Sequence, residues 1–346
     1  MQTDYIIVGC GLAGLSFAQI LKQKQKSFVV IDNNQNKASL VAGGLYNPVM
    51  LKRFTLAWLA DKQIPLAEQF YAEIEKELQI SFDEKKPVRR LIHSAEEQNN
   101  WFQALDKPKV GQFLSDELIE FNHDQITCEY GLGEVHNSGR LKTQTLISGF
   151  IKNLEAHDRY LDQSFDHDQM IIEQDVIRYK NITAKNIVFC EGFGMLKNPF
   201  FNYLPLAGNK GELLLIETSV LNIDFILKSN MFFIPLGGQH YLVGATYNRE
   251  DLSPKPSEKG KSEIEKFLKR MLGDDYKVIE QRAGIRPTVK DRRPLVGTHP
   301  KHPKLALLNG MGSRGVLIAP YTAQILFDHL EFGKVIPEEM NLKRFN

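Results

Sequence analysis

Tyr5-Ile6-Ile7-Val8-Gly9-Cys10-Gly11-Leu12-Ala13-Gly14 is the stretch that decides the fold of this 346-residue chain. Its first four residues form an apolar run that predicts a buried parallel strand, and residues 15–22 have helical character. A second apolar run, residues 28–31, ends on Asp32. The order of strand, glycine turn, helix, strand and terminal acid is typical of a dinucleotide-binding unit.

Each glycine of this turn has its own predicted task. Gly9 permits the tight turn, Gly11 lets the backbone approach a pyrophosphate, and Gly14 lets helix and strand pack closely. The helix then begins near Leu12 and Ala13, where unpaired N–H groups would face the phosphates. An ordinary glycine turn is the alternative interpretation, but it does not explain why all the other parts stand at the expected offsets.

The carboxylate of Asp32 is expected to bind a ribose hydroxyl, and we include its neighbour Asn33 in the predicted cofactor site. This unit alone does not distinguish NAD from FAD. Because the motif begins within ten residues of Met1, we expect no signal peptide or N-terminal anchor.

The composition is that of an ordinary globular protein, and the length favours two domains. Lys and Arg total 43 against 42 Asp and Glu, so no overall field attracts nucleic acid or an anionic membrane. Three scattered cysteines, Cys10, Cys128 and Cys190, suit neither a disulfide framework nor a metal site. We therefore expect a reducing, cytoplasmic location, no metal and, since no apolar segment is long enough to span a bilayer, no membrane segment.

Hydrophobic periodicity predicts the remaining elements. Helices are expected at 56–78 (as one or two), 141–154, 264–271 and 316–330, with a polar loop at 33–39. Strands are expected at 170–172, 176–179, 187–190 and 305–308, and those of an antiparallel sheet at 213–216, 231–234 and 240–243.

Three further glycine-containing turns can bring backbone close to a ligand. They are Ala42-Gly43-Gly44, Glu191-Gly192 at the end of a predicted strand, and Gly310-Met311-Gly312-Ser313-Arg314-Gly315, where a strand leads into a helix from Val316. The last has the form of a phosphate or ring cradle. A plain turn is the alternative for 42–44.

Taken in order, these segments resemble the FAD-dependent D-amino acid oxidase superfamily, which includes glycine oxidase and sarcosine oxidase. The resemblance covers nearly the whole chain and adds the Gly244-Ala245-Thr246 turn and the Gly284-Ile285-Arg286-Pro287 segment, with Asp291 and residues 294–297 after it. Residues 244–249 and 312–315, followed by Ala319-Pro320, most closely resemble the oxidase domain of the bifunctional tRNA wobble-uridine enzyme MnmC.

The resemblance implies an α/β fold with a Rossmann-like FAD-binding domain on a parallel sheet and a discontinuous substrate domain on an antiparallel sheet. The expected FAD-binding parts are 1–80, 139–200 and 290–346, and the substrate-binding parts are 81–138 and 201–289. FAD is expected to be non-covalent, because Ile285 stands where covalent members carry a cysteine. Residues 311–316 would run along the pyrimidine side of the flavin.

The resemblance also implies the substrate site. Arg286 matches the position that pairs with a substrate carboxylate, a task suited to a planar guanidinium, with a purely structural arginine as the alternative. Tyr247 and Tyr46 are expected in the pocket, although a core or surface position is nearly as plausible for Tyr247. Phe232 stands where glycine oxidase has a tyrosine, which counts against free glycine as the substrate.

Three functions follow as hypotheses. The first is an oxidase of an amino acid or N-substituted glycine that passes a hydride to flavin N5, releases an imine to hydrolysis and reduces dioxygen to hydrogen peroxide. The second is an oxidase of carboxymethylaminomethyl-uridine in tRNA, disfavoured by the balanced charge and by the absence of a methyltransferase domain from this sequence. The third is a flavoprotein subunit that passes electrons to a partner.

Overall fold

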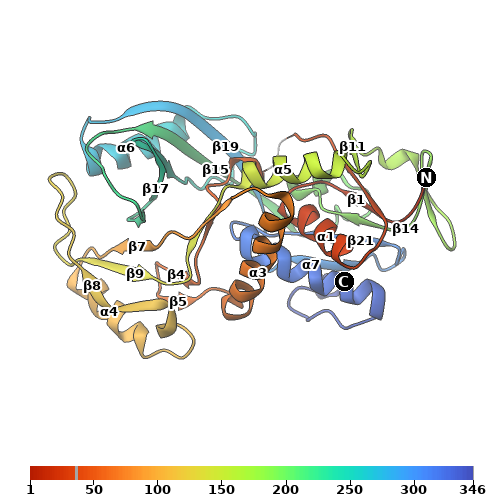
Figure 1. Ribbon diagram of the computed structural model, residues 1–346, viewed down its shortest axis with the longest axis horizontal. Coiled ribbons are helices and arrows are strands. Elements are labelled where there is room, and N and C mark those ends of the chain that lie inside the picture. Colours follow the sequence, from red (N-terminus) through yellow and green to blue (C-terminus); the bar gives the residue numbers. More distant parts are fainter. Residues whose placement is uncertain (36–37, 346) are drawn as a thin grey trace.

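Two large β-sheets organise the computed structural model, which describes residues 1–35 and 38–345. One is largely parallel and the other largely antiparallel, and each has eight strands. In Figure 1 the parallel sheet lies to the right, beside both termini, and the antiparallel sheet lies to the left. The predicted α/β fold class is thereby confirmed.

The parallel sheet is built on the apolar runs that the sequence placed in strands. Its order is β11-β2-β1-β14-β13-β12, with β21 also beside β14 and β20 beside β21. The carboxyl ends of β1, β2, β14 and β21 meet at one edge, where ligands of open α/β sheets bind. The strands are β1 Gln2–Val8, β2 Phe28–Asp32, β11 Tyr160–Asp162, β12 Met170–Ile172, β13 Ile177–Tyr179, β14 Ile182–Phe189, β20 Leu295–Thr298 and β21 Leu305–Asn309.

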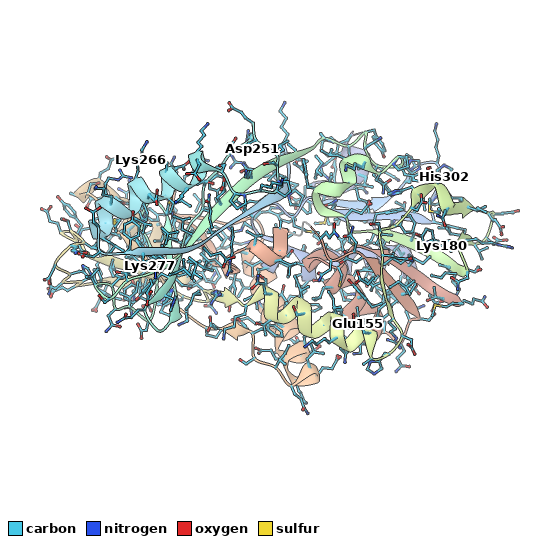
Figure 2. All side chains as sticks on the ribbon, turned by 90° about the horizontal axis from the view of Figure 1, so that it is seen from above. Glu155, Lys180, Asp251, Lys266, Lys277 and His302 are labelled. Atoms are coloured by element: carbon cyan, nitrogen blue, oxygen red, sulfur yellow. The ribbon has the colours of Figure 1, made fainter. Side chains whose placement is uncertain are left out.

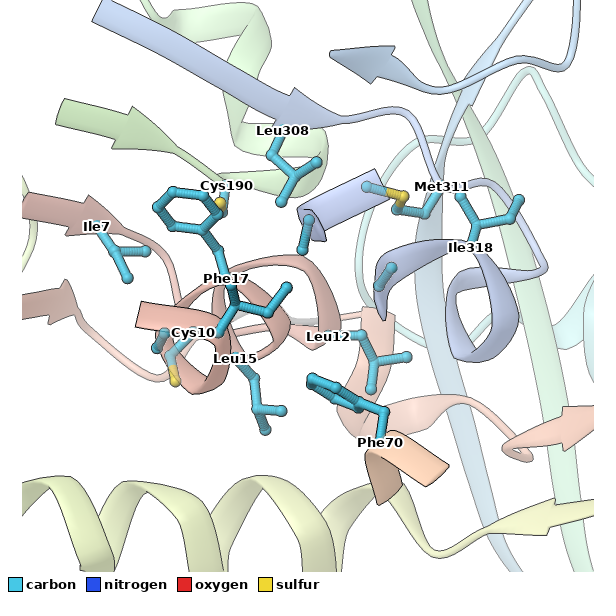
Figure 3. Close-up of a cluster of buried hydrophobic side chains, with 14 of the residues drawn as sticks. Ile7, Cys10, Leu12, Leu15, Phe17, Phe70, Cys190, Leu308, Met311 and Ile318 are labelled. Atoms are coloured by element: carbon cyan, nitrogen blue, oxygen red, sulfur yellow. The ribbon is translucent and has the colours of Figure 1, made fainter. Parts of the chain in front are cut away.

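Helices with apolar faces cover this sheet. They are α1 Leu12–Gln23, α5 Thr143–Glu155 and α7 Gly315–Phe332, and α3 Ala60–Leu78 packs on α7. Helix α3 is a single helix with Pro65 inside it, so the one-helix alternative is correct. Figure 3 shows Leu12, Leu15 and Phe17 of α1 among buried side chains from β1, β21 and α7. This packing fixes the N-terminus of α1 at the carboxyl edge of the sheet.

The second sheet has the order β19-β15-β18-β17-β16-β7-β9-β8. Because β19 is an edge strand, it accommodates Pro287, which has no N–H to donate. The strands are β7 Val88–Leu91, β8 Leu114–Ile119, β9 Leu132–Val135, β15 Leu206–Glu217, β16 Ile226–Lys228, β17 Phe232–Gly237, β18 His240–Gly244 and β19 Lys277–Val289. Helices α4 Ala95–Leu105 and α6 Glu258–Leu272 accompany it.

Short elements complete the described chain. A three-stranded sheet contains β3 Leu45–Tyr46, β10 Gly139–Leu141 and β6 Asp83–Glu84, and a hairpin contains β4 Val49–Met50 and β5 Thr55–Leu56. The 3-10 helices are Gly111–Phe113, His167–Gln169, Gly192–Lys197 and Leu342–Phe345. Among the described residues, none of the helices combines the length and the apolar character needed to cross a bilayer.

The predicted loop at 33–39 needs a correction. Residues 36–37 lie outside the described residues, but Ser39 belongs to the short helix α2 Ala38–Val41, closed by a hydrogen bond from Ala42 N to Ala38 O of 3.0 Å. The domain boundaries remain a prediction. The strands of the first sheet come from residues 2–32, 160–189 and 295–309, and those of the second from 88–135 and 206–289.

Candidate functional site

A cavity of about 1020 Å³ is lined by residues from both large sheets. The first sheet contributes the carboxyl ends of β1, β2, β14 and β21, and the second contributes β15, β17, β18 and β19. This volume is at the upper end of the range for small-molecule sites, so the cavity can hold a ligand of dinucleotide size together with a smaller one.

The first glycine turn forms one wall of this cavity. Gly9, Gly11, Leu12 and Ala13 line it, and Gly9 has a φ of +97°, which favours glycine. Gly14 does not line the cavity. A Cβ at Gly14 would lie 1.9 Å from the carbonyl oxygen of Gly9, so Gly14 holds α1 against the end of β1.

The N-terminus of α1 is open toward the cavity. Its N-cap residue, Gly11, offers no side-chain cap, and the first turn contains no acidic residue. Leu12 N donates to the hydroxyl of Ser39 at 3.3 Å. An uncapped helix N-terminus carries partial positive charge and free N–H donors, which suits a phosphate group.

Asp32 ends β2 and lines the cavity together with Asn33. Its side chain is 8% exposed. The carboxylate accepts hydrogen bonds from Cys10 N at 2.8 Å and Asn34 N at 3.1 Å, so it ties the glycine turn to the second strand. This arrangement holds an acceptor beside the turn, at the position where a ribose hydroxyl is expected.

The turn at 42–44 also faces the cavity, with Ala42, Gly43 and Gly44 in its lining. A Cβ at Gly43 would lie 2.7 Å from Cδ1 of Ile234, and one at Gly44 would lie 1.8 Å from the carbonyl oxygen of Leu141. The close packing on both sides explains why this turn needs small residues.

Glu191 and Gly192 follow β14 and line the cavity. The Glu191 carboxylate accepts from Asn198 Nδ2 at 2.7 Å and lies 3.4 Å from His167 Nε2. His167 also lines the cavity. Sequence reasoning did not select this histidine, because it comes from a polar segment without a motif.

The C-terminal turn supplies the opposite wall through Met311, Gly312, Ser313, Gly315 and Val316. Helix α7 begins here, again without a side-chain cap or an acidic residue in its first turn. Gly310 and Arg314 lie outside the lining. Gly310 packs against Val289 and Leu295, and Arg314 donates to Asn47 O, while burial lowers its pKa to about 10.

Arg286 of β19 lines the cavity on the side of the second sheet. Its Nη1 donates to Asn209 Oδ1 at 3.3 Å and to Thr246 O at 3.2 Å. Burial lowers the pKa of the guanidinium. Within residues 1–35 and 38–345, no carboxylate forms an ion pair with Arg286. A positive charge is thus held in the cavity with only neutral acceptors around it.

Of the three aromatic residues predicted for the pocket, two line the cavity and one does not. Tyr247 lines the cavity, is 67% exposed and has its ring centroid 4.6 Å from Cζ of Arg286. Phe232 also lines it. Tyr46 is not brought to the cavity: it is buried, and its hydroxyl donates to Asp83 Oδ1 at 2.7 Å.

The residues 1–35 and 38–345 contain no group of three or more His, Cys, Asp or Glu side chains arranged to hold a metal ion. Two open helix N-termini, a carboxylate beside the first turn and glycine turns on several sides instead suit an extended, diphosphate-containing cofactor. These features are those of a dinucleotide-cofactor site.

A family model described as DAO, FAD dependent oxidoreductase, matches residues 4–329. The chain belongs to this family. It is an FAD-dependent oxidoreductase.

Individual relatives agree with this assignment. Glycine oxidase of Bacillus subtilis (strain 168) is 32% identical over 351 residues, covering 94% of this chain and 92% of that protein. The tRNA 5-methylaminomethyl-2-thiouridine biosynthesis bifunctional protein MnmC of Acinetobacter baylyi is 23% identical, covering 99% of this chain and 55% of that protein. The chain thus spans about half the length of this second relative.

The crystal structure of glycine oxidase from Geobacillus kaustophilus has the same fold. It superimposes with a TM-score of 0.78 at 18% identity, covering 100% of this chain and 98% of that chain. At 18% identity this similarity shows only that the two proteins share a fold. The substrate of the present chain must therefore be inferred from its own site.

Proposed function

We propose that this protein oxidises the C–N bond of an amino acid or an N-substituted glycine whose carboxylate is bound by Arg286. The observation that carries the proposal is the Arg286 guanidinium, which lines the cavity without a carboxylate partner among the described residues. A guanidinium binds a carboxylate through two parallel charge-assisted hydrogen bonds. The similarity to glycine oxidase of Bacillus subtilis supports the same substrate class.

FAD, when bound, would supply the oxidising power by accepting a hydride from the carbon beside the amine, and dioxygen would reoxidise it to give hydrogen peroxide. The substrate also loses its N–H proton, and water then cleaves the resulting imine. The tasks of the chain are orientation and electrostatics. Arg286 fixes the substrate carboxylate, and the open N-terminus of α7 stabilises negative charge on the cofactor.

The pocket side chains favour a substituted amine over free glycine. Phe232 lines the cavity with a ring that offers no hydroxyl, and Tyr247 lies over the guanidinium. We propose that this aromatic, largely apolar wall contacts an N-substituent or a side chain. Ile285, beside Arg286, also lines the cavity and has no nucleophile, which supports non-covalent FAD.

A tRNA-linked substrate is not favoured. Three basic pairs, Lys85-Lys86, Arg89-Arg90 and Arg292-Arg293, are the candidate phosphate-binding patches, and four of their six side chains are engaged in ion pairs. These are Lys85 with Glu68 and Asp83, Arg89 with Glu134, Arg90 with Glu97, and Arg293 with Glu339. Side chains neutralised in this way attract phosphate groups weakly. We therefore propose a small-molecule amine as the substrate.

Replacing Arg286 by Ala tests the proposed function. We expect binding of carboxylate substrates to weaken by about 2–5 kcal/mol, because one partner of a buried charge pair is removed. Anaerobic bleaching of the flavin absorbance can be followed for each substrate. Amines without a carboxylate provide the control, and an equal loss for both kinds of substrate would contradict the anchor role.

A further inference from the structure

A second cationic side chain, Lys228, lines the same cavity as Arg286. Lys228 is the last residue of β16, opposite Phe232 of β17. Its Nζ donates to Asn230 O at 2.6 Å and lies 4.5 Å from the ring centroid of Phe232. These contacts hold the ammonium group at the wall formed by the second sheet.

Charged side chains lie near Lys228, but none of those described forms an ion pair with its ammonium group. Arg90 of β7, which is paired with Glu97, lies opposite Lys228 in the sheet register and donates to Ser229 O. His93 contacts Ser229 Oγ through Nε2 at 3.2 Å. Among residues 1–35 and 38–345, no carboxylate forms an ion pair with Lys228. Burial, with a smaller contribution from Arg90, lowers its pKa to about 8.

The sheet register relates the two cations in space. The Arg286 guanidinium lies against Gly211 of β15, because a Cβ at Gly211 would be 2.0 Å from Nη2. In the strand order, β18 lies between β15 and β17. Phe232 belongs to β17, and the Lys228 ammonium group lies over its ring. Strands β15 and β17 are two strand spacings, about 10 Å, apart. A molecule with two anionic ends can bridge such a distance.

We propose that Lys228 binds a second carboxylate of the substrate, so that the favoured substrates are amino dicarboxylates. This inference rests on the proposed function, because Arg286 would hold the carboxylate next to the oxidised carbon. The Phe232 ring would contact the methylene groups between the two ends. An ammonium group that has no carboxylate partner in a partly buried site gains a charge-assisted hydrogen bond from such a ligand.

Matched substrate pairs test the proposal on the FAD-loaded enzyme. N-carboxyalkyl glycines with one to three methylenes are compared with N-alkyl glycines of the same length. We expect wild type to prefer the dicarboxylates. In Lys228→Met, the ratio of kcat/KM for dicarboxylate over monocarboxylate should fall about 10- to 100-fold, the loss of one charged hydrogen bond. Lys228→Arg should retain most of the preference.

Lys266 provides the matched control. It is an exposed lysine that projects outward from α6 (Figure 2), so Lys266→Met removes the same charge from the protein without touching the cavity. We expect this variant to keep the wild-type preference. Binding without turnover gives a second measurement: glutarate should perturb the flavin spectrum at lower concentration than butyrate in wild type, but not in Lys228→Met.

The outcomes separate this inference from the proposed function. Equal kcat/KM for both members of each pair in wild type would overturn the role of Lys228 alone. An equal loss for both members in Lys228→Met would also overturn it, because that result indicates a structural lysine. Turnover of carboxymethylaminomethyl-uridine tRNA in preference to every dicarboxylate would overturn it as well. If no amine bleached the flavin while glutarate still bound more tightly than butyrate, the proposed function would fail and the second anion site would stand.

Discussion

Gly211 is the residue that makes room for the Arg286 guanidinium. It lies inside β15, two residues beyond Asn209, which pairs with Arg286 across the sheet. Glycine weakens a strand interior, and it is used there when another group approaches the backbone closely. Here the group is a side chain, since a Cβ at this position would lie 2.3 Å from Cζ of Arg286.

Gly211→Ala is therefore expected to impair substrate binding through Arg286. The added methyl group must displace the guanidinium, with a penalty of about 1–3 kcal/mol that is typical of overpacking. The measurement is the Kd of a carboxylate inhibitor in wild type, both single variants and the double variant with Arg286→Ala. The penalty should vanish once Arg286 is absent, whereas additive effects would show that Gly211 acts on something else.

Lys228 gives the site a pH dependence of defined sign. Its pKa of about 8 lies below the ordinary lysine value, so the ammonium is lost as pH rises through 8. The preference for dicarboxylates, measured as a ratio of kcat/KM, should be constant below pH 8 and fall about tenfold per unit above it. Taking a ratio cancels the titration of the substrate amines, and Lys228→Arg should show no fall in this range.

The titratable groups near Lys228 are not expected to cause the fall in dicarboxylate preference above pH 8. Burial lowers the pKa of His93, which moves its titration further from that of Lys228, and the other neighbours are Arg90 and Glu97. The titration of Lys228 also affects the free energy of unfolding, and its pH dependence has the opposite sign from that of a lysine whose pKa is raised by a salt bridge. Because the folded pKa is depressed, the unfolded chain binds more protons between pH 8 and the ordinary value, and stability from this group rises with pH there.

At the scale of elements, the junction of β1 and α1 combines packing with cofactor binding. Gly11 and Gly14 lie one helical turn apart but have different surroundings. A Cβ at Gly11 would meet only Ser39 Oγ at 3.4 Å, an ordinary contact, whereas one at Gly14 would collide with Gly9. The first glycine therefore keeps the helix N-terminus accessible, and the second keeps the helix in place.

Two alanine substitutions separate these tasks. In the FAD-free protein, Gly14→Ala should lower the melting temperature, because backbone atoms must move, while Gly11→Ala should leave it nearly unchanged. Gly11→Ala should instead weaken FAD binding, by about tenfold or more, because its methyl group occupies the path of the phosphates. Thermal unfolding and flavin fluorescence titration measure the two effects. A large loss of stability in FAD-free Gly11→Ala would refute this division.

At the scale of the whole molecule, the cavity is the place where the two sheets meet. Its lining combines Asp32 and the first turn with Gly312 and with Gly284 of the edge strand β19. A cofactor that fills the cavity contacts both halves at once. Binding to the folded state alone stabilises a protein by RT ln(1 + [L]/Kd).

FAD should accordingly raise the melting temperature, with a stabilisation of about 2.7 kcal/mol at a concentration of 100 Kd. FMN at the same concentration should give a smaller shift, because it lacks the adenosine half that would lie near Asp32. Scanning calorimetry of the FAD-free protein with each flavin measures this difference. Equal shifts from both flavins would contradict the role of Asp32 in this extended site.

The sequence by itself determined the fold class, because strand, turn and helix follow from apolar periodicity and glycine placement within about thirty residues. It indicated FAD only through the family resemblance, since the first turn alone does not distinguish NAD from FAD. It also selected Arg286, through the family resemblance. Tertiary structure alone decided that Lys228 joins the cavity, that Gly211 seats the guanidinium and that Tyr46 bonds Asp83 outside it. Those placements depend on which strands pair and in which register, and register between segments far apart in the chain leaves no local pattern in the sequence.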